Sequence, residues 1–446
     1  MNKIPVISVG MMNREKIDFS LTGDFLLSGR NETVSGNFSA SVENGEISVS
    51  GPSGKISGKE IVFEPSNIES CELELKNVTI GVNFHWEQNE NQRFQGALKL
   101  IVEGGKITAI NVLPIENYLI SVISSEMSAK SSLDLLKAHA IISRSWLIAQ
   151  IEKQGKISGS QTAYKSISET DDEYTRWYDR EDHLHFHVCA DDHCQRYQGT
   201  TRSHNPNVVK AVNETAGVVL SYRGTICDAR FSKCCGGIAE LFENCWEPVN
   251  HPYLTNVIDN PSVPAGFETD LTIDENAARW IHSSPDAFCN TRDEEVLRQV
   301  LNEYDWSAKN FYRWKVEYSQ EQISDLLRRQ SRRDFGQVID LIPVERGKSG
   351  RLVRLRIVGS KKTMIVGKEL EIRRWLSESH LYSSAFTVEK QDIHDGIPQK
   401  FILHGAGWGH GVGLCQIGAA VMGHKGYKYD EILLHYYKDV DLEKRY

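Results

Sequence analysis

The spacing of hydrophobic residues changes along the chain, and the changes predict where strands give way to helices. In the N-terminal quarter, short runs alternate apolar and polar side chains between Gly, Ser and Asn, as at residues 46–50. This alternation is typical of strands with one buried face. Residues 97–102 and 106–110 are two such runs on either side of a Glu-Gly-Gly turn, which predicts a hairpin. We therefore expect a β-rich N-terminal platform over residues 1–106.

A long helix is predicted to follow residue 132. Ser131 or Ser132 can cap its first turn, Asp134 lies within that turn, and apolar residues dominate as far as Ile151. The polar stretch at 153–182 then indicates an excursion over the surface.

Two cations lie on the apolar face of this helix. Lys137 and Arg144 are seven residues apart, so they point the same way at 3.6 residues per turn. An unpaired buried charge is costly, so each cation needs either an anion as a partner or a side chain that extends far enough to place its charged end in solvent. Glu126, just upstream among small and apolar neighbours, is one candidate anion.

A change of composition marks an insert over residues 259–337. Prolines near its start suggest a linker, and helical patterns follow at 274–280, 294–303 and 320–329. We expect this insert to be mainly helical.

Strand patterns return after the insert. A turn rich in glycine separates residues 339–344 from residues 352–358 and predicts a hairpin, and the chain closes on a helix. The predicted class is α+β, with a mixed α/β core formed by residues 107–258 and 338–446.

Histidine and cysteine gather in one short segment. Four His and two Cys fall between His183 and Cys194. Zinc takes four such ligands in a tetrahedron, so the segment predicts a metal site. His185 and His187 remain alternative ligands, because a strand would put them on the same face as His183. The other interpretation is an exposed His-rich turn beside two core cysteines.

A second informative segment is rich in glycine. Residues 405–413 contain five glycines, so the backbone either bends tightly or lets a ligand lie against it. The segment lacks the Gly-Lys-Ser/Thr of a phosphate-binding loop. A structural turn with a buried His410 is the alternative to a binding loop, and a nucleophilic pair of His410 with Cys415 is another.

Composition narrows the function classes. The chain has 446 residues, 40% hydrophobic and 25% charged, as in ordinary globular proteins. Its net charge of -9 argues against nucleic-acid binding. No apolar run is long enough to span a membrane, and the first residues do not resemble a secretory signal. The sequence as written is that of a cytoplasmic chain; the alternatives are export by another route and a start further upstream. Nine cysteines, an odd number, fit reduced thiols with one metal site better than disulfides.

Several segments together resemble the stage II sporulation protein D family, also described as amidase enhancers. The resemblance is carried by residues 113–119 (LPIENYL), 125–127 (SEM), 136–140 (LKAHA) and 405–419 (GAGWGHGVGLCQIGA). Residues 231–237 (FSKCCGG) resemble a further family loop but have Cys234 and Cys235 where Ser is usual; Cys415 likewise replaces Ser. The two vicinal cysteines hint only weakly at a second metal or redox site, since a disulfide between neighbours is strained.

The resemblance implies a peptidoglycan lytic transglycosylase, a lyase that cuts the MurNAc–GlcNAc bond and forms a 1,6-anhydro product. It makes Glu126 the catalytic acid and base. It also implies a zinc site at His183, Cys189, His193 and Cys194, structural if all four bind. The expected substrate-binding residues are Lys137, Arg144, Trp408, His410 and Gln416. The implied partner is the peptidoglycan glycan strand, and family members usually work in the cell envelope.

Two other functions fit the same sequence. One is a non-catalytic glycan-binding module that enhances a cell-wall amidase. The other is a zinc-dependent hydrolase with only three protein ligands, which leaves a position for water.

The transglycosylase hypothesis places conflicting demands on the surroundings of Glu126. A catalytic acid needs a raised pKa, which adjacent cations oppose, so Lys137 and Arg144 must stand back from Glu126 or contact substrate.

Overall fold

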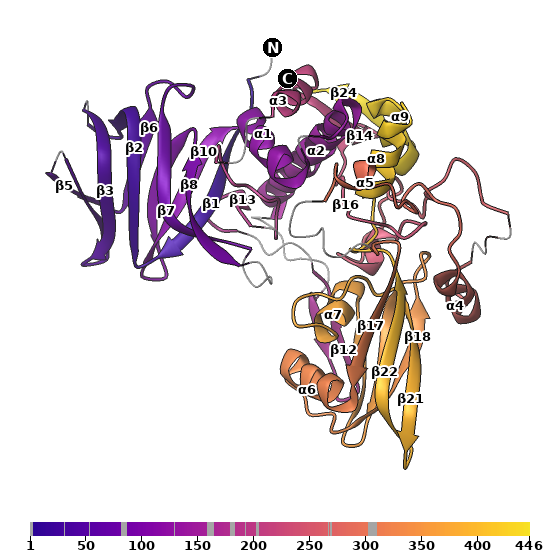
Figure 1. Ribbon diagram of the computed structural model, residues 1–446. Helices are drawn as coiled ribbons and strands as arrows, with labels where there is room; N and C mark the ends of the chain where they lie inside the picture. The colour runs from indigo at the N-terminus through magenta and orange to yellow at the C-terminus, as the bar shows by residue number, and fades with distance from the viewer. Residues whose placement is uncertain are drawn as a thin grey trace.

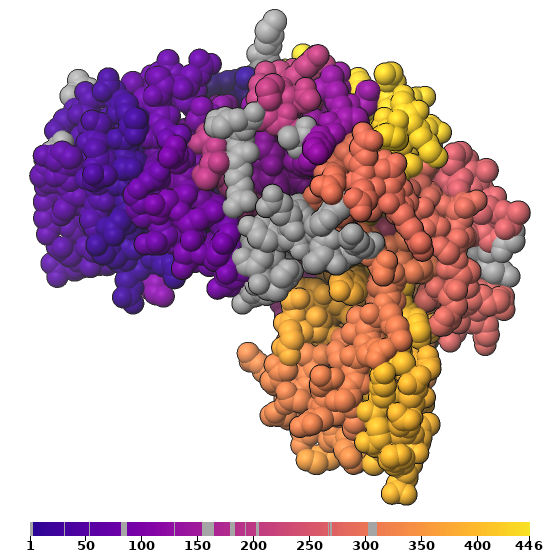
Figure 2. All heavy atoms as spheres, in the orientation of Figure 1, coloured from indigo at the N-terminus to yellow at the C-terminus, as the bar shows by residue number. Residues whose placement is uncertain are grey.

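The computed structural model has three lobes (Figure 1). An N-terminal sheet lies on one side, a helical layer occupies the centre, and a lobe built on two sheets projects below it; Figure 2 shows the same lobes with all atoms drawn. The predicted α+β class and β-rich N-terminal region are confirmed. The structure describes residues 3–30, 32–52, 54–81, 87–128, 130–157 (main chain alone at 154–157), 165–178, 183–191, 193–201, 205–265, 267, 270–301 and 310–446.

The N-terminal sheet forms because apolar side chains recur at every second residue. Ile17, Phe19 and Leu21 on one strand all face the core. The rings of Phe19, Phe38 and Phe63 pack there with centroids 5.2 to 5.6 Å apart. The described strands run in the order β13 (Val188–Cys189), β1 (Val6–Arg14), β10 (Lys106–Pro114), β9 (Ala97–Glu103), β6 (Glu60–Pro65), β2 (Lys16–Leu27), β3 (Thr33–Glu43), β4 (Glu46–Gly51) and β5 (Gly54–Gly58). In addition, β7 (Glu72–Ile80) pairs with β2, and β8 (Gln88–Phe94) pairs with β7. The predicted hairpin is confirmed as the antiparallel pair of β9 and β10.

The central layer contains the predicted long helix, α2 (Leu133–Ile157). Ser132 caps it, because its Oγ accepts a hydrogen bond from the Leu135 N–H at 3.2 Å. The sequence analysis did not predict α1 (Ile115–Glu126), which follows β10 without a loop, although its buried apolar residues recur at helical spacing. The other helices of the layer are α3 (Pro206–Glu214), α8 (Gln416–His424) and α9 (Tyr429–Tyr436).

Short strands complete the centre. β14 (Val218–Tyr222) pairs with β15 (Thr225–Ile226) and with β24 (Asp441–Lys444), and β16 (Phe231–Ser232) pairs in parallel with β23 (Leu414–Cys415). The two ends of the chain meet at the start of α1. The Pro5 carbonyl accepts from the Ile115 N–H at 2.9 Å, and Tyr446 donates to Glu116 at 2.7 Å.

The lower lobe has its own core around Trp375. One sheet contains β17 (Arg313–Ser319), β22 (Ile397–Ala406) and β21 (Phe386–His394). The other contains β11 (Ile167–Glu169), β12 (Glu173–Arg176), β20 (Thr363–Gly367), β19 (Leu352–Gly359) and β18 (Val338–Arg346), of which β18 and β19 are the predicted hairpin. The helices α6 (Gln320–Ser331) and α7 (Glu369–Trp375) pack on these strands.

Two boundary predictions need correction. The polar stretch at 153–182 was predicted to be a surface excursion, but part of it, β12, pairs in parallel with β20 in a sheet of the lower lobe. The segment 259–337 is not a separate helical insert. It contains α4 (Asp274–His282) and α5 (Glu294–Leu297), but β17 pairs along its whole length with β22 and therefore belongs to the lower lobe. Among the helices that the structure describes, none combines the length and the apolar character that crossing a bilayer requires.

Candidate functional site

Glu126 lies at the C-terminal end of α1 and is partly exposed. Within the described residues no hydrogen bond or ion pair joins its carboxyl group to another side chain. Its neighbour Ser125 turns its hydroxyl inward to the Ser121 carbonyl at 2.9 Å. The acid that the family resemblance singles out is therefore available to a ligand.

Arg144 pairs with a different acid from the one expected. Its Nε and Nη2 donate to the two carboxylate oxygens of Glu116 at 3.0 and 2.6 Å, and its Nη1 donates to the Val218 carbonyl at 2.9 Å. The guanidinium is fully buried. The charge of Arg144 is thus neutralised inside the core, and its contact with substrate stays a prediction.

Lys137 also has its own carboxylate. Its Nζ lies 2.6 Å from Glu214 on α3 and 5.6 Å from the ring centre of Tyr429. The side chain keeps 18% of its exposure, so Lys137 remains a candidate for substrate contact. Both cations of α2 therefore have carboxylate partners other than Glu126.

Residues 299 and 300 connect the segment after Glu126 with the segment that precedes the glycine-rich turn in space, through hydrogen bonds to their main-chain carbonyls. The Gln299 carbonyl accepts from the Ser128 N–H at 3.0 Å and from the Ser131 hydroxyl at 2.7 Å. The next carbonyl, that of Val300, accepts from Lys233 Nζ at 3.0 Å. Lys233 follows β16, which pairs with β23 at the end of the glycine-rich segment.

The glycines wrap around an internal arginine. Arg351 is fully buried and donates to the Gly409 carbonyl at 3.1 and 3.3 Å. Gly407 and Gly411 have φ near 75° and 78°, and a Cβ on Gly411 would lie 2.5 Å from the Arg351 guanidinium carbon. Of the two interpretations of this segment, the tight structural turn explains these glycines.

Two residues expected at the substrate site are engaged inside the protein. Burial, with a smaller effect of Lys233, lowers the pKa of His139 to about 3, so its neutral ring accepts from the Gln416 amide at 3.0 Å. Gln416 is only 2% exposed, and its contact with substrate stays a prediction. His410 accepts from the Val412 N–H at 3.0 Å and is only partly exposed.

Trp408 is the expected binding residue that keeps an accessible ring. It is partly exposed, and it stacks on Phe311 and packs against Tyr382 with both centroid distances at 4.6 Å. Flat aromatic surfaces of this kind suit the apolar face of a sugar. Phe311 and Tyr382 were missed because each is isolated from Trp408 in the sequence.

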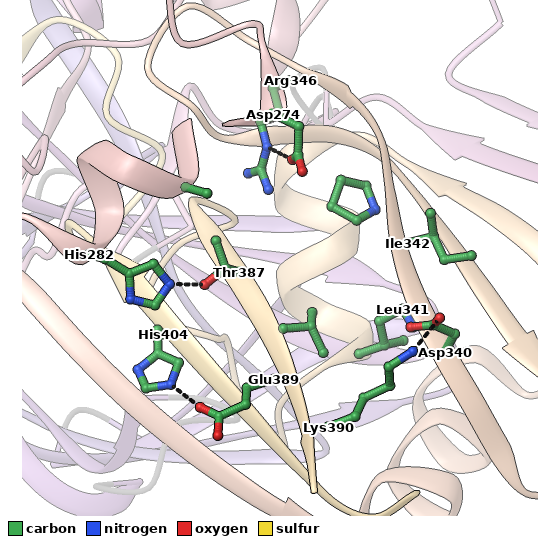
Figure 3. Close-up of a pocket in the computed structure, with 13 residues that line it drawn as sticks. Asp274, His282, Asp340, Leu341, Ile342, Arg346, Thr387, Glu389, Lys390 and His404 are labelled. Atoms are coloured by element: carbon green, nitrogen blue, oxygen red, sulfur yellow. Dashed lines mark hydrogen bonds and ion pairs between the residues drawn. The ribbon is translucent and has the colours of Figure 1, made fainter. Parts of the chain in front are cut away.

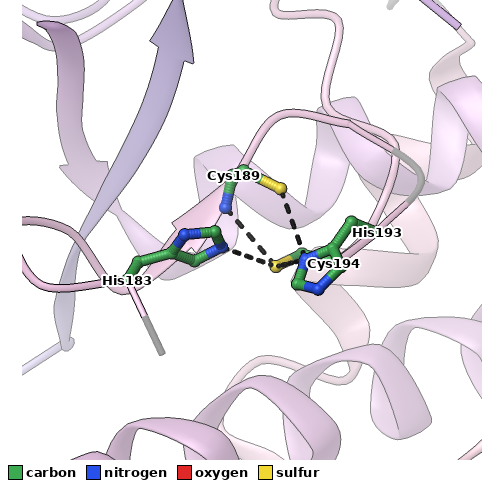
Figure 4. Close-up of side chains that lie close together, drawn as sticks. All are labelled: His183, Cys189, His193 and Cys194. Carbon is green, nitrogen blue, oxygen red and sulfur yellow. Dashed lines mark hydrogen bonds between the residues drawn. The ribbon is translucent and has the colours of Figure 1, made fainter. Parts of the chain in front are cut away.

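The predicted metal ligands come together (Figure 4). The Cys194 sulfur lies 3.4 Å from His183 Nε2 and 3.4 Å from His193 Nδ1, and the Cys189 sulfur lies 3.8 Å from His193 Nδ1. Ligand atoms on a tetrahedral zinc ion are separated by about 3.5 to 3.8 Å. Hydrogen bonds, chiefly from Cys194 and then from His183 and His193, lower the pKa of the Cys189 thiol to about 2, which favours the thiolate that a metal needs. The donor set therefore fits a metal ion.

The segment that carries the cluster, residues 183–194, contacts the N-terminal sheet and is linked to α1. β13 pairs in parallel with β1, so that Cys189 lies opposite Gly10, and a Cβ on Gly10 would meet the Phe186 ring at 2.4 Å. Tyr118 of α1 donates to Gln195 at 3.3 Å. The cluster is thereby connected to the helix that ends in Glu126.

The two alternative histidines face elsewhere. His187 Nδ1 accepts from the Ser8 N–H at 3.1 Å, and His185 lies 3.9 Å from Glu103. The four residues that lie together are those implied by the family resemblance.

A second cluster was not predicted as a set. Cys235, Asp259, Cys289 and Cys415 are all buried, and their ligand atoms lie within 4.8 Å of one another. They come from four separate segments, so no local spacing could reveal them. Because the Cys415 sulfur accepts from the Cys235 N–H at 3.3 Å, it faces this cluster and not His410.

A groove of about 520 Å³ lies in the lower lobe, between α4 and strands β18, β21 and β22 (Figure 3). His282 bonds Thr387 at 2.9 Å and His404 bonds Glu389 at 3.0 Å along its wall. None of the residues predicted to act on substrate lines this groove.

The chain is similar to known proteins over most of its length. A family model for stage II sporulation protein matches residues 103–222, and one for a domain of unknown function (DUF8618) matches residues 240–413. The amidase enhancer of Bacillus subtilis (strain 168) is 24% identical over 333 residues, which cover 72% of this chain and 39% of that protein. This chain thus spans about two-fifths of the length of that relative.

The matches to two further relatives cover similar shares of this chain and of the relative. An uncharacterized protein of Brachyspira hyodysenteriae is 25% identical over 350 residues, covering 78% of this chain and 72% of the relative. The stage II sporulation protein D of Bacillus amyloliquefaciens is 23% identical over 346 residues, covering 75% of this chain and 76% of the relative. The first family match contains α1, Glu126 and the metal-ligand loop. This chain carries a domain of the stage II sporulation protein family, and the amidase enhancer and stage II sporulation protein D are its relatives.

Proposed function

We propose that this protein acts on the peptidoglycan of the bacterial cell wall and cleaves its glycan strands as a lytic transglycosylase, with Glu126 as the acid and base. The relatives named amidase enhancer and stage II sporulation protein D support a cell-wall role. The observation that carries the enzyme proposal is the state of Glu126. It is a partly exposed acid without a described ion pair, and the two cations of α2, Lys137 and Arg144, are paired with other carboxylates.

One carboxyl group is enough for this chemistry. Glu126 donates its proton to the glycosidic oxygen as the bond from that oxygen to the muramyl C1 breaks. The resulting carboxylate then accepts the proton of the muramyl C6 hydroxyl as that oxygen bonds to C1 and closes the 1,6-anhydro ring. No water is consumed, so the second carboxylate of most hydrolysing glycosidases is not required.

The cluster of His183, Cys189, His193 and Cys194 would hold zinc in a structural role. Four protein ligands complete a tetrahedron and leave no position for a reacting water. The zinc-dependent hydrolase needs such a position, so the four gathered ligands favour the transglycosylase.

The test is the product that each variant releases. Glycan strands, with and without stem peptides, are incubated with the wild type and with Glu126→Gln, and the products are analysed by mass spectrometry. We expect anhydro-muramyl ends from the wild type and a loss of about 10²–10⁴-fold in the variant, the usual contribution of a general acid or base. Glu152→Gln is the matched control, because it removes an exposed carboxylate of α2 from the same helical layer. Equal release by wild type and Glu126→Gln would end the proposal.

A glycan-binding enhancer is the second candidate, favoured by the name of the B. subtilis relative and by the accessible ring of Trp408. The same variants separate the two. An enhancer keeps its effect on a purified cell-wall amidase in Glu126→Gln and loses it in Trp408→Ala, whereas a transglycosylase depends on Glu126.

A further inference from the structure

The core of the protein contains a compact group of three thiols and one carboxyl group. Cys235, Asp259, Cys289 and Cys415 are each at most 1% exposed. Within the described residues, no hydrogen bond or ion pair joins their sulfur or carboxylate atoms to a Lys, Arg or His side chain; Arg351 donates only to the main-chain carbonyl of Cys235, at 3.2 Å. Arg313 donates to the carbonyls of Gly236 at 3.0 Å and Ser283 at 2.9 Å.

The distances fit a shared metal ion. The sulfurs of Cys235 and Cys289 lie 3.7 Å apart. Two thiolates on a tetrahedral zinc ion, with metal–sulfur bonds of about 2.3 Å, are separated by about 3.8 Å. A disulfide would require about 2.05 Å. The thiols are thus spaced as co-ligands and not as a bonded pair.

Neighbouring groups orient the ligands as an outer shell does in metal sites. Cys415 begins α8, and its sulfur accepts from the Gly418 N–H at 3.4 Å, where the helix dipole favours a thiolate. Asp259 accepts from the Tyr436 hydroxyl at 2.6 Å and from the Cys289 N–H at 2.8 Å, which fixes its carboxylate toward the sulfurs.

We propose that Cys235, Cys289 and Cys415 bind a second divalent metal ion of the zinc type through three thiolates, with the carboxylate of Asp259 as the fourth ligand. This site is separate from the cluster at residues 183–194 and does not depend on the proposed function. With four protein ligands and no exposure it would be structural. It would join the start of α8 to three loops that lie within or beside the second family match.

Metal content of the full chain tests the proposal. The key sample is the double variant Cys189→Ser/Cys194→Ser, which empties the first cluster and keeps all four ligands of the second. We expect about one equivalent of zinc after purification under reducing conditions. After exchange for Co²⁺, we expect sulfur-to-cobalt charge-transfer absorption from three thiolates. Adding Cys289→Ser should remove both signals, whereas the buried Cys227→Ser, outside the cluster, should change neither.

Other results would overturn the proposal. One is a folded double variant, verified by circular dichroism, that holds no metal. Another is a peptide pair cross-linked through Cys235 and Cys289 in protein prepared without reductant, which would make the cluster a redox pair. If the double variant does not fold, the wild type decides: two equivalents of zinc against one in Cys289→Ser support the second site, and equal content refutes it. Within the site, Asp259→Asn should lower zinc retention and Cys234→Ser should not; the opposite pattern would reject Asp259 as the fourth ligand.

Discussion

The two ends of α1 carry the same residue type in opposite situations. Glu116, in the first turn, accepts from Arg144, from the Gly217 N–H at 3.2 Å and from the Tyr446 hydroxyl at 2.7 Å. Glu126, ten residues later at the last turn, is partly exposed and has no described hydrogen bond or ion pair. A fully paired carboxylate holds a fold together, whereas an unpaired one is available for chemistry.

The contrast shows what decides whether an acid is structural or functional. Both residues sit in segments that match the family, and local sequence does not distinguish their roles. The partners of Glu116 come from positions 28, 101 and 330 residues away in the chain. The four predictions that follow would break or sharpen this contrast, and their expected effects decrease in order.

Replacing Arg144 by Met should have the largest effect on stability. It leaves Glu116 as a buried carboxylate without its cation, so we expect the free energy of unfolding to fall by about 3–5 kcal/mol. Denaturant titration measures this change. The protein that remains folded should retain its specific activity. If Arg144→Met were as stable as the wild type yet inactive, Arg144 would belong to the substrate site after all.

Cys194→Ser tests whether the cluster of His183, Cys189, His193 and Cys194 stabilises the fold or takes part in the reaction. We expect it to lose the zinc at that site and about 2.7 kcal/mol of stability at free zinc 100-fold above Kd. Thermal unfolding with and without added zinc reports this difference. Activity per folded molecule should persist, and Cys71→Ser, a buried thiol elsewhere, should show no zinc dependence. Loss of activity without loss of stability would favour the zinc hydrolase.

The buried His139 should make stability depend on pH. Its pKa is lowered to about 3 by burial, against about 6.5 in an unfolded chain. Between these values the unfolded chain binds the extra proton, so the stabilisation is complete above pH 6.5 and falls by up to about 1.4 kcal/mol per pH unit as acid is added. His139→Asn should flatten this slope in denaturant titrations from pH 7 to pH 5, and the exposed His424→Gln should not. A slope unchanged by His139→Asn would contradict the assignment.

Lys137 should give the smallest change in stability. Its pair with Glu214 is partly solvated, so Lys137→Met should cost about 0.2–1 kcal/mol, far less than Arg144→Met on the same helix. Comparing the two variants in one denaturant series checks this ratio. A raised KM for glycan in Lys137→Met would assign Lys137 to substrate binding, whereas an unchanged KM would place it with Arg144.

The features that the sequence predicted are those formed by contacts between residues close together in the chain. The α+β class, the hairpins with glycine turns, the long helix capped by Ser132 and the segment from His183 to Cys194 all depend on near neighbours. The partner of Arg144 and the second thiol cluster could not be predicted, because they join residues far apart in the chain. The helix α1 has no capping side chain at Pro114, but the helical spacing of its apolar residues is a signal that could have predicted it. β17 was assigned to a helical insert because its partner β22 lies much further along the chain.

The most direct test of the account is the mass of the muramyl end released from purified glycan strands by wild type, Glu126→Gln and Glu152→Gln. The account predicts 1,6-anhydro ends, one water lighter than hydrolysed ends, from wild type and Glu152→Gln, and none above background from Glu126→Gln. Hydrolysed ends from the wild type, or anhydro ends in equal amount from Glu126→Gln, would contradict it.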